Sequence, residues 1–268
     1  ITKFPVEFYT TMEDAAKAYA TANPGVEIVY GQGASGTDIE GQVAQIESMV
    51  VQGVQGIAIT PVDPTVAAAL DKAVAAGVKV VLMDNDIPGW AGKSALATTN
   101  NFNAGKIAGE YLKSVLKDGD TLGILEGVPG VPALDDRVTG MLEGLAPVKV
   151  NVVGKGATNC AQETGQSVAE DLLTANPGLK AIYSACGPAA VGATQAIANA
   201  GIANDDIVMV GFDACCGEMD KIASGQEDAT VAQYPAKMGE LGVAALVAAI
   251  KGEPVESLID TGAGLVTK

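Results

Sequence analysis

The sequence predicts an α/β fold made of two doubly wound, parallel-sheet lobes, and two observations carry this prediction. Apolar, strand-like runs alternate with amphipathic helical segments along the whole 268-residue chain. This pattern is typical of parallel sheets that are covered by helices on both faces. A weak internal repeat also divides the chain: Pro64 and Pro188 each begin a helical run that ends 13 residues later at a glycine, and a strand ending in aspartate follows each run.

The individual elements follow from local patterns. Eight apolar segments have the character of strands: 26–30, 55–60, 78–83, 121–126, 148–153, 180–184, 206–212 and 229–232. The first few residues resemble the end of a further strand. A helix is expected over 10–22, and another over 38–52, where apolar residues recur every three or four positions.

The composition fits a globular protein that does not act on nucleic acid. Hydrophobic residues make up 48% of the chain and charged residues 18%, which provides enough apolar side chains for a sizeable core. A net charge of −16 opposes binding to a phosphate backbone. Histidine, the commonest general base, is absent. We therefore expect a protein that is not an enzyme and that holds no cofactor or metal ion.

Polar residues gather where the predicted parallel strands end, which is where such sheets bind ligands. These ends carry Asp, Asn, Thr and Arg, for example in "DND" at 84–86 and "FDA" at 212–214. Carboxylates and amides exchange hydrogen bonds with hydroxyl groups, and an arginine fork holds two oxygens. The set favours a neutral polyhydroxylated ligand, although each Asp or Asn also has helix capping or turn formation as an alternative role.

The glycines Gly31, Gly33 and Gly36 form the spacing of a dinucleotide-binding fingerprint, which would indicate a dehydrogenase. That fingerprint belongs to the first strand–helix turn of a sheet, whereas these glycines follow what we predict to be the second strand. The acidic residue required about 20 positions later is also missing. We therefore expect a flexible turn here, with a capping box from Thr37 to Glu40 at the start of the helix.

Longer motifs resemble the periplasmic sugar-binding proteins of the ribose-binding type. The matching segments are "QIESMVVQGVQGIAITPVDP" (45–64), "AGVKVVLMDND" (76–86), "NNFNAGKIAGEYL" (100–112), "EGVPGVPALDDRVTGM" (126–141), "VMVGFDA" (208–214), "ATVAQYPAKMGELG" (229–242) and "LVTK" at the end. The resemblance covers nearly the whole chain. It implies two doubly wound lobes joined by a three-strand hinge, the type I periplasmic binding protein fold, with a ligand enclosed between them. The lobes would be 1–99 with 234–259, and 100–233 with 260–268.

The resemblance also implies a set of ligand-binding residues. They are Phe4 as a stacking aromatic, with Phe8 as its rival, and Thr60, Asp84, Asn85, Asn101, Arg137, Cys186, Asp213 and Gln233. The chain departs from the family pattern at Asn85, where an arginine is common, and at Cys186-Gly187, where an Asn-Asp pair is common. The loop 157–165 lacks the usual aromatic residue. A less charged site favours a pentose or a short sugar alcohol over a hexose.

The four cysteines, Cys160, Cys186, Cys215 and Cys216, all follow predicted strands of the second lobe. In a 2-1-3-4-5 strand order, the strands before Cys186 and before Cys215 are neighbours. We therefore expect a disulfide from Cys186 to Cys215 or Cys216, with Cys160 taking the remaining partner. Buried free thiols and a zinc site are the alternatives, and zinc would have to bind without histidine or a C-x-x-C pair.

The resemblance implies a solute receptor that delivers its ligand to the membrane permease of an ABC transporter. We expect a monomer that is located in the periplasm or outside the cell and binds no nucleic acid. We also expect a signal peptide or a lipid-anchored cysteine before Ile1. The alternative is the effector-binding core of a regulator of the lactose-repressor type, which shares the fold. Such a regulator needs a basic helix-turn-helix headpiece, and disulfides and strong acidity are unusual for it.

Overall fold

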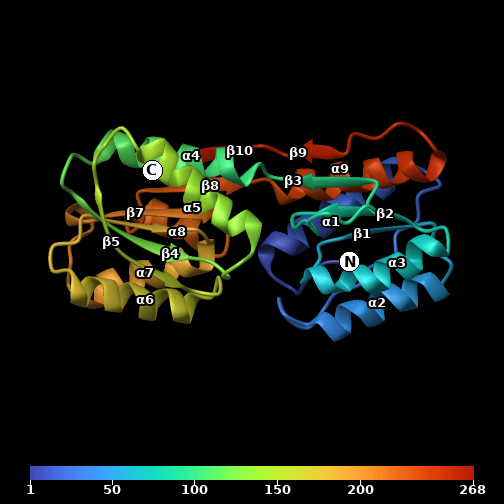
Figure 1. Ribbon diagram of the computed structural model, residues 1–268, viewed down its shortest axis with the longest axis horizontal. Coiled ribbons are helices and arrows are strands. Elements are labelled where there is room, and N and C mark those ends of the chain that lie inside the picture. The colour runs from blue at the N-terminus through green and yellow to red at the C-terminus, as the bar shows by residue number, and fades with distance from the viewer. The chain divides into compact units, whose positions relative to one another are not determined.

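The computed structural model describes all 268 residues, which form two compact units (Figure 1). Unit 1 comprises Ile1–Thr99 and Tyr234–Thr261, and unit 2 comprises Asn100–Gln233 and Gly262–Lys268. The chain therefore passes between the units three times. The third passage comes two residues later than expected, because Asp260 still pairs with Thr98 in the sheet of unit 1.

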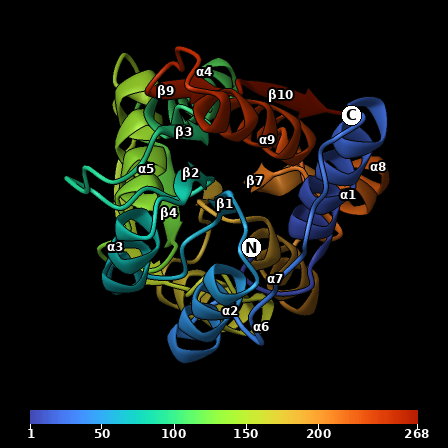
Figure 2. The same ribbon diagram turned by 90° about the vertical axis from the view of Figure 1, so that its right-hand side faces the viewer.

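Unit 1 contains a parallel sheet of four strands in the order β1-β2-β3-β9, with helices on both faces (Figure 2). The strands are β1 (Gly56–Ile59), β2 (Lys79–Met83), β3 (Ala95–Thr98) and β9 (Leu258–Asp260). The helices are α1 (Glu7–Ala22), α2 (Ile39–Val51), α3 (Ala67–Ala75), which follows the 3-10 turn Pro64–Val66, and α9 (Pro235–Lys251). Alternate residues of β2 serve the two faces: Val80 and Leu82 pack in the core with α2 and α3, whereas Val81 packs against α9.

Residues 26–30 are not a strand, so this prediction is wrong. Next to this segment, the backbone forms only an isolated β-bridge, between Thr2 and Gln32, and the side chains of Val29 and Tyr30 are exposed. The physical reason is a shortage of pairing partners, because only Ile1 and Thr2 continue the sheet beyond β1. The Thr60 amide donates a hydrogen bond to the Ile1 carbonyl at 2.9 Å. The short strands β3 and β9 were not predicted.

The glycine-rich segment packs against the N-terminal residues of unit 1. A side chain at Gly33 would lie 2.6 Å from the Lys3 carbonyl oxygen, and one at Gly36 would meet the Phe4 ring at 3.1 Å. The predicted capping box is wrong: the N-cap of α2 is Asp38, whose carboxylate accepts hydrogen bonds from the amides of Gly41 (2.9 Å) and Ala34 (2.8 Å). The glycines thus allow close packing and a tight turn into α2.

Unit 2 contains a six-stranded sheet in the order β10-β8-β7-β6-β4-β5, in which only β10 is antiparallel. Its strands are β4 (Thr121–Glu126), β5 (Asn151–Ala157), β6 (Ala181–Ser184), β7 (Val208–Asp213), β8 (Ala229–Gln233) and β10 (Ala263–Thr267). Its helices are α4 (Asn101–Val115), α5 (Pro132–Leu145), α6 (Gln162–Ala175), α7 (Gly187–Asn199) and α8 (Glu218–Ser224), and a 3-10 turn spans Asn204–Asp206. The five parallel strands confirm the predicted 2-1-3-4-5 order.

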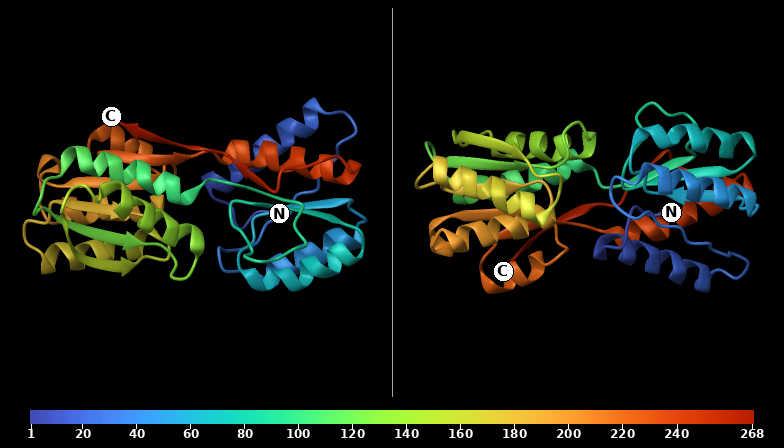
Figure 3. Two further views of the ribbon diagram at one scale, coloured as in Figure 1. Left: turned by 45° about the horizontal axis from the view of Figure 1, so that its top comes forward. Right: turned by 90° about the horizontal axis from the view of Figure 1, so that it is seen from below.

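Helices cover both faces of this sheet as well (Figure 3). Ile124 of β4 packs in a core with α4 and α5, and the next residue, Leu125, packs in a second core with α6 and α7. None of the helices in either unit combines the length and the apolar character needed to cross a membrane. The carboxyl ends of the five parallel strands lie along one edge of the sheet, and the polar residues of unit 2 gather there.

Candidate functional site

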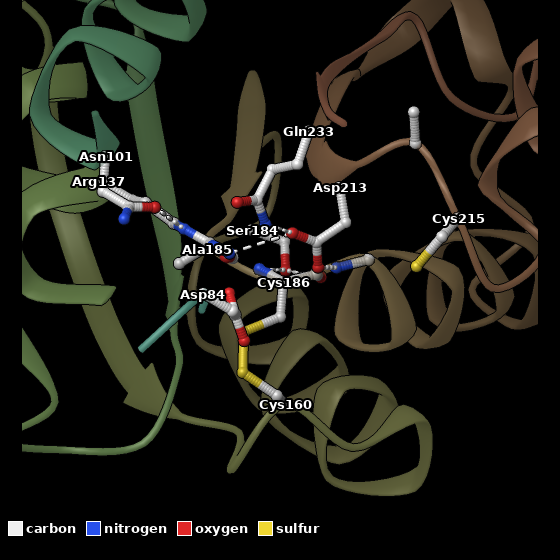
Figure 4. A network of polar contacts seen from close by, with 12 residues as sticks. Asp84, Asn101, Arg137, Cys160, Ser184, Ala185, Cys186, Asp213, Cys215 and Gln233 are labelled. Carbon is white, nitrogen blue, oxygen red and sulfur yellow. Dashed lines mark hydrogen bonds and ion pairs between the residues drawn. A yellow bond between two sulfur atoms is a disulfide. The ribbon is translucent and has the colours of Figure 1, made fainter. Parts of the chain in front are cut away.

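Arg137 is the centre of the polar network in unit 2 (Figure 4). It lies on α5 and its side chain is only 6% exposed. Its Nε donates a hydrogen bond to Asn101 Oδ1 at 2.9 Å, and its Nη1 donates to the Ala185 carbonyl at 2.8 Å. One face of the guanidinium lies 4.0 Å from the centre of the Phe212 ring. These contacts fix the plane of the guanidinium before any ligand contact is made.

Asp213, the last residue of β7, neutralises the charge of Arg137. Its Oδ1 accepts hydrogen bonds from Arg137 Nη1 at 3.0 Å and from Gln233 Nε2 at 2.7 Å, and its Oδ2 accepts from the Gly187 amide at 3.1 Å. Each partner comes from a different element, so the carboxylate links α5, β8 and the start of α7. The network is therefore a paired cation and anion with no net charge.

Gln233, at the end of β8, has one polar atom without a partner. Its Nε2 is committed to the Asp213 carboxylate, and this fixes which way the amide faces. Its Oε1 is buried and accepts no hydrogen bond from the protein. A buried acceptor without a donor costs roughly 1–3 kcal/mol, so this atom suits a hydroxyl donor from a ligand.

In unit 1 the predicted residues Phe4 and Asp84 are joined by a residue that was not predicted, Tyr9. The Tyr9 hydroxyl donates to Asp84 Oδ2 at 3.1 Å, and its ring makes an edge contact with the Phe4 ring, with centroids 5.6 Å apart. Phe8, the rival of Phe4, is buried and also packs edge-on against Tyr9. The segment "FPVEFY" thus has a half-buried Phe4 and a core Phe8, a distinction that residue type alone does not reveal.

Thr60 and Asn85 hold the backbone at the ends of β1 and β2. Thr60 is fully buried, and its hydroxyl lies 3.5 Å from the Ile1 carbonyl oxygen. Asn85 Nδ2 donates to the Pro61 carbonyl at 3.3 Å, which ties together the loops that follow the two strands. The Asn85 contact thereby positions the loop that follows Asp84.

The two predicted carboxylates share an unusual backbone conformation. Asp84 has φ of 62° and Asp213 has φ of 104°, both in the region that non-glycine residues rarely adopt. Asp84 directly follows β2, and Asp213 is the last residue of β7. Such strain is often found where a side chain must be held at a functional position.

The predicted cysteine pairing is wrong. The disulfides join Cys160 to Cys186 and the adjacent residues Cys215 and Cys216. Strand adjacency misled the prediction, because the loop after β5 crosses the end of β4 and brings Cys160 to 5.3 Å from Cys186, measured between Cα atoms. Gly127 at the end of β4 leaves room for this crossing, since a side chain there would lie 3.2 Å from Cys160 Sγ.

Two buried glutamates, Glu218 of α8 and Glu227 of the turn before β8, lie behind the network and were not predicted. One oxygen of each lies over Gly211, which has no side chain to occupy that space. Glu218 accepts hydrogen bonds from the Cys215 amide at 3.1 Å and from Thr230 Oγ1 at 2.9 Å. Burial raises the pKa of Glu227 to about 8. Burial, and then the charge of Glu227, raise the pKa of Glu218 well above its usual range, so the pair retains a proton at neutral pH.

The structure therefore brings four of the predicted residues into one network in unit 2, namely Asn101, Arg137, Asp213 and Gln233. Cys186 lies beside this network but is 2% exposed and bonded to Cys160. The backbone partners Ala185 and Gly187 were not predicted, because no side chain marks a residue that acts through its carbonyl or amide.

Comparisons with known proteins agree with this architecture. The family model described as a periplasmic binding protein domain matches residues 2–254. A D-ribose/D-allose-binding protein of Pseudomonas aeruginosa is 30% identical over 276 residues, which cover 97% of this chain and 85% of that protein. An ABC transporter solute-binding protein of Agrobacterium vitis with bound D-fucose has a TM-score of 0.91 and 30% identity, covering 100% of this chain and 94% of that one. A solute-binding protein of Burkholderia graminis in complex with D-arabinose has a TM-score of 0.90 and 29% identity. This match covers 100% of this chain and 95% of that one.

Proposed function

Because the chain belongs to the periplasmic binding protein family, we propose that it is an extracytoplasmic receptor that binds one small neutral sugar or sugar alcohol and passes it to the permease of an ABC transporter. The similar proteins named above are binding proteins for sugars rather than enzymes. The family places the protein outside the cytoplasm. A lipid anchor beyond Ile1 and a monomeric state remain part of this proposal.

The Arg137–Asp213 pair is the observation that carries the choice of a neutral ligand. An anionic ligand near Arg137 would be repelled by Asp213, and a cationic ligand near Asp213 would be repelled by Arg137. Hydroxyl groups avoid this conflict, because each one both donates and accepts hydrogen bonds. The unpaired Gln233 Oε1 adds an acceptor for one more hydroxyl hydrogen.

We favour a pentose or a short sugar alcohol within this class. The name of the similar protein from P. aeruginosa includes the pentose D-ribose beside the hexose D-allose, and the similar protein from B. graminis is in complex with the pentose D-arabinose. The departures at Asn85 and Cys186 remove charged or polar groups that the family pattern commonly has, which leaves fewer partners for a larger sugar. Phe4, Thr60, Asp84 and Asn85 of unit 1 are proposed to contribute to ligand binding together with the unit 2 network.

A thermal-shift panel tests the proposal. The panel contains D-ribose, D-arabinose, D-allose, xylitol, arabinitol, D-glucose and NAD at saturating concentration. A ligand that binds only the folded protein raises its melting temperature, by an amount that corresponds to about 2.7 kcal/mol at 100 times Kd. We expect a rise with at least one pentose or pentitol and none with NAD. A rise with NAD alone, which the Gly31–Gly33–Gly36 spacing would have predicted, contradicts the proposal.

A further inference from the structure

The turn at residues 184–187 contacts the Arg137–Asp213 pair from both sides. Its Ala185 carbonyl accepts a hydrogen bond from Arg137 Nη1 at 2.8 Å, and its Gly187 amide donates to Asp213 Oδ2 at 3.1 Å. A displacement of this turn would therefore alter the position of both charged groups. Gly187 cannot be replaced by a larger residue without disturbance, since a side chain there would lie 2.4 Å from Glu218 Oε2.

The turn has no conventional cap of its own. Cys186 is the N-cap residue of α7, and its side chain makes no capping hydrogen bond, because its sulfur is bonded to Cys160. Ser184 Oγ bonds only within the turn, to the backbone of Cys186. The Gly187 amide, the first of α7, is satisfied by Asp213 instead. The position of the turn thus depends on contacts from outside it.

The other end of the disulfide lies on a well-fixed loop. Thr158 is fully buried, and both its amide (2.9 Å) and its hydroxyl (2.7 Å) donate to the Glu126 carbonyl at the end of β4. The Cys160 amide in turn donates to Thr158 Oγ1 at 3.3 Å. The disulfide (Figure 4) therefore connects the turn at 184–187 to a loop that is itself hydrogen-bonded to the end of β4.

We propose that the Cys160–Cys186 disulfide is a positioning element of the binding site, which holds the 184–187 turn so that the Ala185 carbonyl and the Gly187 amide fix Arg137 and Asp213. Its consequence for sugar affinity rests on the proposed function. Cys186 then acts through its neighbours in the turn. This role explains why a cysteine stands at a position where the family pattern commonly has a polar pair.

The first test uses amide hydrogen exchange measured by NMR, which needs no ligand. Cys160→Ser cuts the bridge and leaves the sequence of the turn unchanged. The double variant C160S/C186S also cuts the bridge, and it leaves no free thiol at residue 186. We expect exchange at the Gly187 amide to accelerate by about tenfold or more in both variants. The Val210 amide, in the central strand β7, serves as the control and should keep its protection. Unchanged exchange at Gly187 would overturn the proposal.

The second test measures whether the disulfide acts on affinity through Asp213. In the wild-type background, cutting the bridge should raise Kd for the sugar identified by the panel by about tenfold. In an Asp213→Asn background the same cut should change Kd by less than about threefold, because the group being positioned is already lost. Equal fold-changes in the two backgrounds would show that the disulfide acts elsewhere. If the oxidised wild-type protein binds no sugar, the proposed function fails, and the Gly187 exchange still decides the positioning role.

Discussion

Arg137 and Gln233 illustrate how single residues are held in the candidate site. Arg137 uses Nε, Nη1 and one face of its guanidinium for contacts within unit 2, so its remaining amino group is presented in a fixed direction. Gln233 uses its amide nitrogen for Asp213 and keeps a buried oxygen without a donor. Both residues were expected at the site from the family resemblance, but their mutual bonds through Asp213 were not predicted, since they depend on side-chain geometry.

The unpaired oxygen of Gln233 leads to a prediction at this scale. Gln233→Leu should weaken binding of the panel sugar by about tenfold, the value of one hydrogen bond to a ligand hydroxyl. The free energy of unfolding without sugar should change by less than about 1 kcal/mol, because the substitution removes an unsatisfied acceptor together with one hydrogen bond. Calorimetric titration and urea unfolding provide the two measurements. A loss of stability with unchanged affinity would assign Gln233 a structural role only.

At the scale of elements, the loops after β5, β6 and β7 carry most of what was not predicted in unit 2. Strand order follows from the alternation of apolar runs and helices, and the predicted order of the parallel strands in unit 2 was confirmed. Which cysteines meet depends instead on how the loop after β5 crosses β4, and no local pattern specifies that path. The same holds for Glu218 and Glu227, which come together only because Gly211 leaves space between α8 and β8.

The buried glutamates predict a pH dependence of stability. Burial raises the pKa of Glu227 from 4.5 to about 8, so the folded protein binds more protons than the unfolded chain between these values. The contribution of this group to the free energy of unfolding therefore falls as pH rises from about 4.5 to about 8. Glu227→Gln should reduce the decline in the free energy of unfolding between pH 5 and pH 8 by at least about 1 kcal/mol, because one pKa unit corresponds to about 1.4 kcal/mol. Urea unfolding at several pH values measures this decline.

Glu253→Gln provides the matched control, since Glu253 is exposed and lies in unit 1, after α9. The free energy of unfolding of Glu253→Gln should decline with pH as it does in the wild-type protein. Identical declines in Glu227→Gln and the wild-type protein would contradict a proton held by the Glu218–Glu227 pair.

At the scale of the whole molecule, the division of the chain into two units follows from three passages between them. The internal repeat and the family resemblance indicated this division, whereas the exact strands at the edges required the structure. Residues 26–30 failed as a strand for lack of partners, and the strands β3, β9 and β10 were not predicted. Sequence patterns and the family resemblance were thus sufficient for the architecture, and insufficient for the contacts that orient the polar residues.

The most direct test of the account is a calorimetric titration of the panel sugar into the wild-type protein, Arg137→Met and Lys106→Met. Lys106 is a matched control, because it is a cation of unit 2 that pairs with Glu143 on the surface. We predict one sugar per chain for the wild-type protein and for Lys106→Met, with equal Kd. We predict a Kd at least about 100-fold higher for Arg137→Met, since a charged hydrogen-bond donor is lost and Asp213 loses its partner. Wild-type affinity in Arg137→Met would contradict the account.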